Sequence, residues 1–221
     1  MLKAVVFDMD GVLINSEPLW QEEERKVFGS LGIELTPHMQ EATYGLAPKE
    51  MVEHWYNYKP WNGKSHEDVK GELLKRVITR VMNGIQPMDG VVNILDLFKG
   101  KGLKIGLASS SPMNMIEAVT KSLGISNYFD VLCTAEDEGH AKPHPAVYIS
   151  AIKKLNVRPA NTMAIEDSFL GILSAKAARM KVLAVPDKTH FDEPKFVIAD
   201  LKLPSLQEFD KDHFEYLNQL N

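Results

Sequence analysis

Two acidic residues separated by one position stand directly after a short apolar run near the start of the chain. The run covers residues 4–7, and Asp8, Asp10 and Gly11 come after it. A continuous apolar run is typical of a strand in a parallel sheet that is covered on both faces. The carboxyl ends of such strands form the crevice where open α/β sheets bind ligands. Because neighbouring carboxylates are unfavourable without a compensating cation or proton, the pattern predicts a hard metal ion, a charged substrate, or both.

Strand-length apolar runs recur in the second half of the chain, where they alternate with helical patterns. The further runs are 103–108, 131–134, 163–165, 182–185 and a weaker one at 196–199. Helical periodicity covers 89–99, 112–123, 144–155 and 168–178, with a final helix expected after Asp212. This alternation predicts βαβ units. We therefore expect an α/β fold with a doubly wound, parallel-sheet, Rossmann-like core.

The stretch between the first and second expected strands breaks this rhythm. It contains helical patterns without strands, at 18–31, 37–43, 48–57 and 65–83. Such a stretch is too long for a crossover and too helical for a loop. We therefore expect an inserted helical cap domain at 15–84, with the core made of 1–14 and 85–221.

Composition narrows the class of protein. The chain has 221 residues, 44% of them apolar, and a formal net charge of −5. The acidic balance argues against nucleic-acid binding, and no apolar run has the length of a membrane span. The single cysteine, Cys133, cannot form an internal disulfide, and no secretory leader pattern precedes the first strand, so we expect a cytoplasmic protein. The seven histidines show no metal-ligand spacing, which argues against zinc.

Four short motifs stand at or just after the carboxyl ends of expected strands. They are Asp8-Met9-Asp10-Gly11-Val12, Ser109-Ser110, Lys142 within Ala141-Lys142-Pro143, and Glu166-Asp167-Ser168. With these motifs in this order and a helical insert after the first, the chain resembles the haloacid dehalogenase-like hydrolases over nearly its whole length. Within their β-phosphoglucomutase-like subfamily, segments such as Ser16-Glu17-Pro18-Leu19-Trp20 are similar to the 2-deoxyglucose-6-phosphate and hexitol phosphatase branch.

The resemblance implies a Mg²⁺-dependent phosphatase that works through an aspartyl-phosphate intermediate. Asp8 would be the nucleophile, and Asp10 the general acid and base. Asp8 and Asp167 would hold Mg²⁺ through side-chain oxygens and Asp10 through its main-chain carbonyl, with Glu166 in a second layer around the metal. The residues expected to bind the phosphate are Asp8, Met9, Asp10, Ser109, Ser110 and Lys142.

The expected substrate is a small phosphorylated metabolite, a sugar or sugar-alcohol phosphate such as 2-deoxyglucose, sorbitol or mannitol 6-phosphate. The cap would close over it and supply the contacts that determine specificity. The candidates for those contacts are Glu17, Trp20, Tyr44 and Lys49. We expect the protein to act as a monomer, without a nucleic-acid or membrane partner.

Two other functions stay open at this stage. A β-phosphoglucomutase-like mutase would use the same Asp8 and Asp10, but Pro112 and Met113 stand where those mutases hold a second phosphate. A non-catalytic module that binds Mg²⁺ or accepts a phosphoryl group would have no use for a hydrolytic acid and base at Asp10. Taken singly, the two aspartates can also form an ordinary turn, and the serines from 109 to 111 a helix N-cap.

Overall fold

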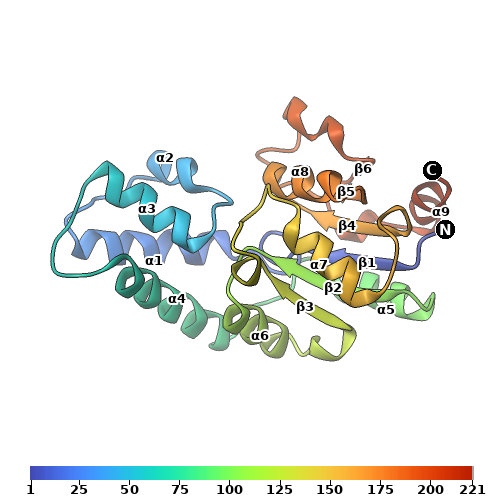
Figure 1. The fold of residues 1–221 in the computed structure, drawn as a ribbon, viewed down its shortest axis with the longest axis horizontal. Coiled ribbons are helices and arrows are strands. Elements are labelled where there is room, and N and C mark those ends of the chain that lie inside the picture. Colours follow the sequence, from blue (N-terminus) through green and yellow to red (C-terminus); the bar gives the residue numbers. More distant parts are fainter. Residues whose placement is uncertain (221) are drawn as a thin grey trace.

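A parallel sheet lies at the centre of the computed structural model, which describes residues 1–220 (Figure 1). Within these residues the strands are β1 (Ala4–Phe7), β2 (Lys104–Ser109), β3 (Val131–Thr134), β4 (Thr162–Glu166), β5 (Lys181–Ala184) and β6 (Leu201–Lys202). Their order is β3-β2-β1-β4-β5-β6, and every neighbouring pair is parallel. The strand order reverses at β1, so the carboxyl ends of β1, β2 and β4 meet at the place where such sheets bind ligands.

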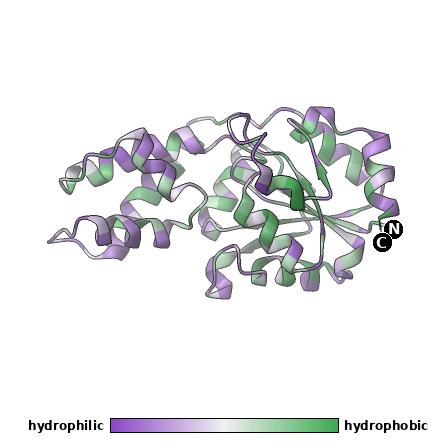
Figure 2. Ribbon diagram, turned by 90° about the horizontal axis from the view of Figure 1, so that it is seen from above, coloured by the Kyte–Doolittle hydropathy of each residue, from purple (hydrophilic) through white to green (hydrophobic). Residues whose placement is uncertain are grey.

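Helices cover both faces of the sheet, which is why its strands read as continuous apolar runs. These helices are α5 (Val91–Gly100), α6 (Met113–Ser122), α7 (Ala146–Leu155), α8 (Phe169–Ala177) and α9 (Lys211–Gln219). Val5 and Phe7 pack in one apolar layer with residues of α5, α6 and α9, while Ala4 and Val6 pack in the other with residues of α7 and α8. Figure 2 shows hydrophobic residues concentrated between the strands and the helices that flank them. The expected α/β fold is confirmed.

The chain between β1 and β2 is helical in the structure. Its elements are α1 (Glu17–Ser30), α2 (Pro37–Gln40), the 3-10 turn Glu41–Thr43, α3 (Pro48–Tyr58) and α4 (His66–Met82). They pack on one another beside the sheet, α1 against α4 and α3 against α4 (Figure 1). We call residues 17–82 the helical segment. The domain boundaries at 15 and 84 stay a prediction.

The two connections between the helical segment and the sheet lie side by side. Ile14 forms β-bridges with both Asp10 and Pro87. The N–H of Met88 donates to the carbonyl of Leu13 at 2.8 Å. These contacts hold the outgoing and returning chain together at the edge of the crevice, where α1 begins.

One expected strand is wrong. Residues 196–199 are not extended, because a 3-10 turn spans Pro194–Ile198, and the last strand of the described sheet is β6, at Leu201–Lys202. Pro194 explains the difference, since its ring holds φ in the helical range and it has no N–H to give to a strand ladder. The remaining 3-10 turns are Ser126–Tyr128, Ala135–Glu138, Pro159–Asn161 and Leu206–Glu208.

Across residues 1–220, none of the helices combines the length and the apolar character that crossing a membrane requires.

Candidate active site

A cavity lies between the carboxyl end of the sheet and the helical segment. Its sheet side is lined by residues that follow β1, β2 and β4 and by a lysine before α7: Asp8, Asp10, Ser109, Ser110, Ser111, Lys142 and Asp167. Its other side is lined by residues of the helical segment, among them Glu17, Trp20, Glu24, Thr43, Tyr44 and Met51. Three of the four predicted motifs contribute polar residues to this lining, and the fourth does so through Asp167 and Ser168 but not Glu166.

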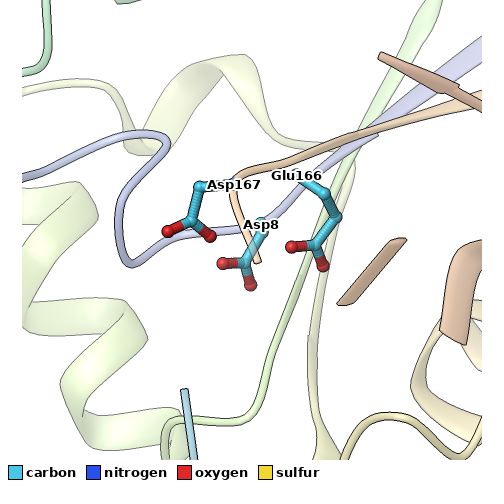
Figure 3. Close-up of side chains that lie close together, drawn as sticks. All are labelled: Asp8, Glu166 and Asp167. Atoms are coloured by element: carbon cyan, nitrogen blue, oxygen red, sulfur yellow. The ribbon is translucent and has the colours of Figure 1, made fainter. Parts of the chain in front are cut away.

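Three carboxylates converge at the sheet side of this cavity, two of them in its lining and the third, Glu166, behind it. One oxygen from each of Asp8, Glu166 and Asp167 lies within 4.8 Å of the others, and all three residues are buried. Figure 3 shows the carboxylates of Asp8 and Asp167 side by side at the ends of their strands, with Glu166 next to them. Burial, and then the charges of Asp8 and Glu166, raise the pKa of Asp167 well above its usual range. The cluster therefore carries more negative charge than its surroundings balance.

Lys142 is the cation inside the cluster. Its Nζ donates to Oδ1 of Asp8 at 2.6 Å and to Oε1 of Glu166 at 2.6 Å, and also to the carbonyl of Ala108 at 3.0 Å. Burial lowers the pKa of Lys142, but the carboxylates of Asp8 and Glu166 outweigh it, and the net shift is upward. The lysine therefore stays charged. Glu166 also accepts a hydrogen bond from the hydroxyl of Tyr148, which fixes its carboxylate behind the cavity.

Two glycines make room for these carboxylates. A Cβ at Gly11, whose φ is +76°, would lie 2.0 Å from Oδ2 of Asp167. A Cβ at Gly171 would lie 2.1 Å from the carboxylate of Glu166. Only glycine allows the main chain to come so close. Buried oxygen donors with excess negative charge are the set that a hard divalent cation prefers, so the residues present fit Mg²⁺.

Asp10 is held differently from Asp8. Its Oδ2 accepts from the hydroxyl of Ser111 at 2.9 Å, and its Oδ1 accepts from the hydroxyl of Ser16, just before α1. Burial raises the pKa of Asp10, the charge of Asp8 adds to the shift, and the serine hydrogen bonds oppose it. A carboxyl whose pKa is raised above its ordinary value holds a proton more readily and can both give and take it, which is what general acid and base chemistry needs.

The predicted residues do not all lie in the cavity. The backbone N–H of Ser111 donates to the hydroxyl of Ser109 at 3.0 Å, and both residues line the cavity with Ser110. Met9 does not line it: its side chain is fully buried in the apolar core, because alternate residues leaving a strand point to opposite sides. Only the main chain of Met9 can face a phosphate.

Lys49 also lies outside the cavity, which corrects the expectation that it contacts the substrate there. It lines a separate groove with His140 and His144, and its Nζ lies 4.0 Å from Oε1 of Glu53. As the second residue of α3, it points away from the cavity, whereas Pro48 and Met51 line it. The other three candidates of the helical segment, Glu17, Trp20 and Tyr44, do line the cavity. The hydroxyl of Tyr44 also donates to Oδ2 of Asp167 at 3.3 Å.

Several residues that line the cavity went unpredicted from the sequence, among them two that bear on its chemistry. Ser111 holds Asp10, and Glu24 faces the cavity from α1. A signal for Glu24 exists: it stands seven residues after Glu17 and four after Trp20, a spacing that puts all three on one face of a helix. Ser111 stands next to the second motif but reads as part of a helix cap.

Several known proteins are similar to this chain in sequence or in fold. The pattern of the haloacid dehalogenase-like hydrolase family matches residues 5–185. The chain is 41% identical over 206 residues to hexitol phosphatase B of Escherichia coli K12, which covers 93% of each protein. It is 31% identical over 187 residues to the phosphorylated carbohydrates phosphatase of Thermotoga maritima, covering 80% of this chain and 82% of that one. Its fold is similar to the crystal structure of a β-phosphoglucomutase from Clostridium difficile, with a TM-score of 0.86, 25% identity, and coverage of 99% of this chain and 98% of that one.

Proposed function

The chain belongs to the haloacid dehalogenase-like hydrolase family and is a sugar phosphate phosphatase, and on that premise we propose that it hydrolyses hexitol and hexose 6-phosphates with Mg²⁺, through an aspartyl-phosphate on Asp8. The observation that carries the proposal is the contrast between two aspartates in one cavity. Asp8 is paired with the charged Lys142, whereas Asp10 is held by two hydroxyls and has a raised pKa. The environment of Asp8 suits a nucleophile, and that of Asp10 suits a general acid and base.

The metal site we propose consists of the side chains of Asp8 and Asp167 and the main-chain carbonyl of Asp10. When bound, Mg²⁺ would supply the positive charge that allows an anionic nucleophile and an anionic phosphate to meet. Glu166 lies behind this set, paired with Lys142 and Tyr148.

The side chains of the sheet would carry out the chemistry. A carboxylate oxygen of Asp8 attacks phosphorus, and the bond from phosphorus to the alcohol oxygen breaks. Asp10 gives its proton to the departing alcohol, then takes one from the water that attacks the acyl-phosphate and releases phosphate. Lys142 balances the charge on Asp8 and on the phosphoryl group, and Ser109 lies where its hydroxyl can hold a phosphoryl oxygen.

The charges that line the cavity favour hydrolysis over transfer to a second site. Among the described lining residues, Lys142 is the only cation, and Asp8 and Glu166 already engage it. Pro112 and Met113 do not line the cavity, and Lys49 faces another groove. A mutase would need a second cation to bind the second phosphate of a sugar bisphosphate, and the described lining of this cavity does not provide one.

The test is phosphate release from a panel of esters, with and without Mg²⁺, by the wild type, Asp8→Asn and Asp10→Asn. The panel contains sorbitol, mannitol, 2-deoxyglucose and glucose 6-phosphates and β-glucose 1-phosphate. We expect Mg²⁺-dependent release from the 6-phosphates by the wild type and a loss of at least about 10³-fold in both variants, since each removes a group that acts in the transition state.

Glu22→Gln is the matched control, because Glu22 lies on α1 outside the cavity, and it should behave as the wild type. Release of no phosphate by the wild type would refute the proposal. Conversion of β-glucose 1-phosphate to glucose 6-phosphate with a bisphosphate primer would instead support a mutase.

A further inference from the structure

Glu24 is a buried carboxylate that the chemistry at phosphorus does not use. It is 3% exposed, it lies on α1, and it lines the cavity together with Glu17 and Trp20 of the same helix. The three residues stand at positions i, i+3 and i+7 and so form one stripe along the helix. This stripe is the part of the wall that α1 presents to the portion of a substrate beyond its phosphate.

Gln40 holds the Glu24 carboxylate in a defined position. Its Nε2 donates to Oε2 of Glu24 at 2.9 Å and to the carbonyl of Gln21 at 3.0 Å. Its Oε1 accepts from Nη1 of Arg25 at 2.7 Å. These three bonds use both donors and the acceptor of the buried amide, so its orientation is determined by its neighbours. Such support is what a recognition group needs in order to discriminate.

The other oxygen of Glu24 is open to the cavity. Within residues 1–220, the hydrogen bond from Gln40 is the only one to this carboxylate. Among these residues, the only side-chain polar atom that is sealed from solvent without a partner is Nε1 of Trp55. Oε1 of Glu24 therefore has no protein partner, yet it is not sealed. It is an acceptor facing the space that a substrate would enter.

The position of Glu24 suits the far end of a six-carbon chain. Ser16 contacts Asp10 at the reacting end, and Glu24 stands eight residues later, about 12 Å further along the helix axis. Its side chain leans back toward the helix N-terminus, which shortens that span by a few Å. In an extended hexitol 6-phosphate the terminal hydroxyl lies about 10 Å from phosphorus, at roughly 1.2 Å of reach per bond. Three-carbon esters do not reach this far.

Charge along the cavity indicates what kind of group belongs there. The only cation among its described lining residues, Lys142, contacts Asp8 at the phosphate end. On the α1 side the cavity is lined by two carboxylates, Glu17 next to Ser16 and Glu24 further along the helix. Burial raises the pKa of Glu24 to about 7, and the charge of Glu17 adds to the shift. A second phosphate or a carboxylate would meet repulsion here, whereas hydroxyls can donate to the carboxylate.

We propose that Glu24, positioned by Gln40, is the specificity-determining residue that accepts a hydrogen bond from the terminal hydroxyls of a six-carbon neutral polyol phosphate and excludes esters with an anionic far end. This assignment rests on the proposed function, because it concerns the leaving alcohol of that same reaction. It predicts a higher kcat/KM for hexitol phosphates than for three-carbon esters or hexitol bisphosphates.

The experiment compares kcat/KM for four esters: sorbitol 6-phosphate, 1-deoxysorbitol 6-phosphate, glycerol 3-phosphate and sorbitol 1,6-bisphosphate. Each is measured with the wild type, Glu24→Gln and the control Glu22→Gln. In Glu24→Gln the kcat/KM for sorbitol 6-phosphate, divided by that for glycerol 3-phosphate, should fall about 10-fold. This is the usual contribution of a hydrogen bond to a charged group. The kcat/KM for the bisphosphate, divided by that for sorbitol 6-phosphate, should rise. Both ratios should keep their wild-type values in Glu22→Gln.

The 1-deoxy ester tests the same contact without altering the protein. The wild type should prefer sorbitol 6-phosphate to 1-deoxysorbitol 6-phosphate by about 10-fold, and Glu24→Gln should lose most of that preference. Ratios unchanged in Glu24→Gln, or a wild type indifferent to the terminal hydroxyl, would overturn the inference and leave the proposed function intact. A wild type that hydrolyses none of the four esters would overturn both.

Discussion

Glu23 and Glu24 are neighbours on helix α1, each 3% exposed, and yet they lie in opposite electrostatic environments. Glu23 faces α4. Its carboxylate accepts from Nη1 of Arg80 at 3.0 Å and from Nζ of Lys26 at 2.8 Å, and it lies 3.7 Å from Nη1 of Arg76. Burial would raise the pKa of Glu23, but the hydrogen bonds and charges of Lys26 and Arg80 outweigh it, and the net shift is downward.

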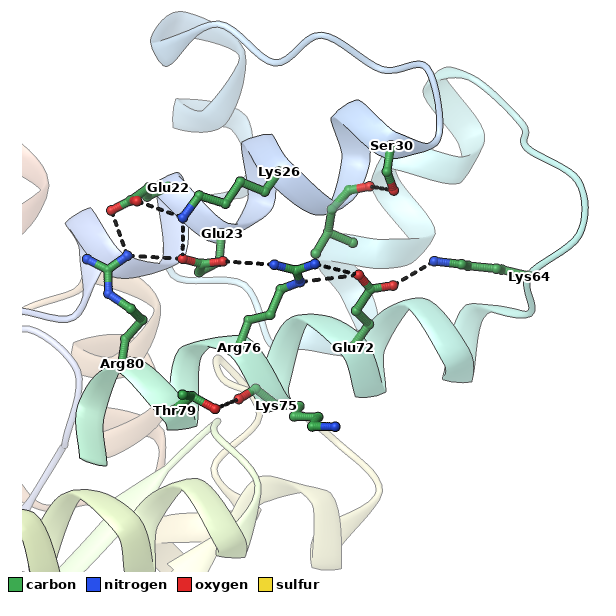
Figure 4. Close-up of polar contacts among 11 residues, drawn as sticks. Glu22, Glu23, Lys26, Ser30, Lys64, Glu72, Lys75, Arg76, Thr79 and Arg80 are labelled. Atoms are coloured by element: carbon green, nitrogen blue, oxygen red, sulfur yellow. Dashed lines mark hydrogen bonds and ion pairs between the residues drawn. The ribbon is translucent and has the colours of Figure 1, made fainter. Parts of the chain in front are cut away.

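Figure 4 shows that Glu23 belongs to a larger network that joins α1 to α4. Acidic and basic side chains contact one another along this network, which consists of Glu22, Glu23, Lys26, Lys64, Glu72, Arg76 and Arg80. Every carboxylate in this network has at least one cation within 4.0 Å. Charge on this face of α1 is balanced within the protein and serves to attach one helix to another.

The side of α1 that carries Glu24 is the contrary case. Glu24 has one neutral partner, Gln40, and a pKa of about 7. On the sheet side of the cavity, Asp8 and the Glu166 behind it share the single Lys142. The difference shows that the protein balances charge where helices meet and leaves it unbalanced where a ligand enters. Unbalanced buried charge lowers stability and is typical of sites under functional constraint.

Removing the cation of the cavity should have the largest effect. In Lys142→Met, the buried carboxylates of Asp8 and Glu166 lose their common partner. We expect turnover to fall by about 10²–10³-fold, the usual loss of one transition-state charge contact. We expect stability to fall by about 3–5 kcal/mol, because breaking a buried pair leaves uncompensated charge. Phosphate release measures the turnover, and urea unfolding measures the stability.

The matched control for that variant lies in the network. Lys26→Met removes a cation whose side chain is 46% exposed and whose partners also contact Arg80. Its turnover should equal that of the wild type. Equal stability losses in the two lysine variants would contradict the distinction between a balanced and an unbalanced face.

Adding a cation should stabilise the cavity and leave the network unaffected. We expect Mg²⁺ to raise the melting temperature of the wild type, by an amount equivalent to about 2.7 kcal/mol at a concentration of 100 Kd. Asp167→Asn should lose this shift, because it removes a proposed ligand, whereas Glu23→Gln should keep it. A shift in Asp167→Asn equal to that of the wild type would place the cation elsewhere. Differential scanning fluorimetry over a Mg²⁺ titration measures it.

Glu24→Gln should stabilise the protein in a pH-dependent way. The pKa of Glu24 is raised from 4.5 to about 7 in the folded protein, so between these values the folded state binds more protons than the unfolded one. The contribution of this carboxyl to stability is therefore full below about pH 4.5 and is lost as the pH rises through about 7. We expect Glu24→Gln to exceed the wild type by about 1–3 kcal/mol at pH 8 and to differ little at pH 5. Urea unfolding at both pH values decides this, and a gain that is equal at both would exclude ionisation as its cause.

Glu23→Gln should have the smallest effect and the opposite sign. Its cations lie on partly exposed side chains, so they can turn to water when the carboxylate is removed. We expect a loss of about 1 kcal/mol at pH 8 that shrinks in high salt, as partly exposed ion pairs do. A stability gain in this variant would refute the view that the α1–α4 face is electrostatically satisfied. Chemical unfolding at low and high salt measures it.

Much of the fold and site could be predicted because the relevant signals are local. The apolar run at 4–7, and those that became β2 to β5, are continuous because both faces of the sheet are buried. The motif residues Asp8, Ser109 and Asp167 come together because parallel strands end at one edge. The strand expected at 196–199 was wrong because Pro194 overrode an apolar pattern. The side chain of Met9 and the placement of Lys49 depended on which way a residue points, which spacing near an element's end does not determine.

The amino-acid sequence by itself determined the α/β core, the helical segment after the first strand, and the identity of the groups at the strand ends. It did not distinguish Glu23 from Glu24, which are the same residue type at adjacent positions of one helix. Successive residues of an α-helix point about 100° apart, so the packing of α1 against α4, and its position beside the cavity, decide which glutamate meets arginines and which meets the cavity. The charge state of each follows from that packing, because a buried carboxylate takes its pKa from the groups that the fold places around it.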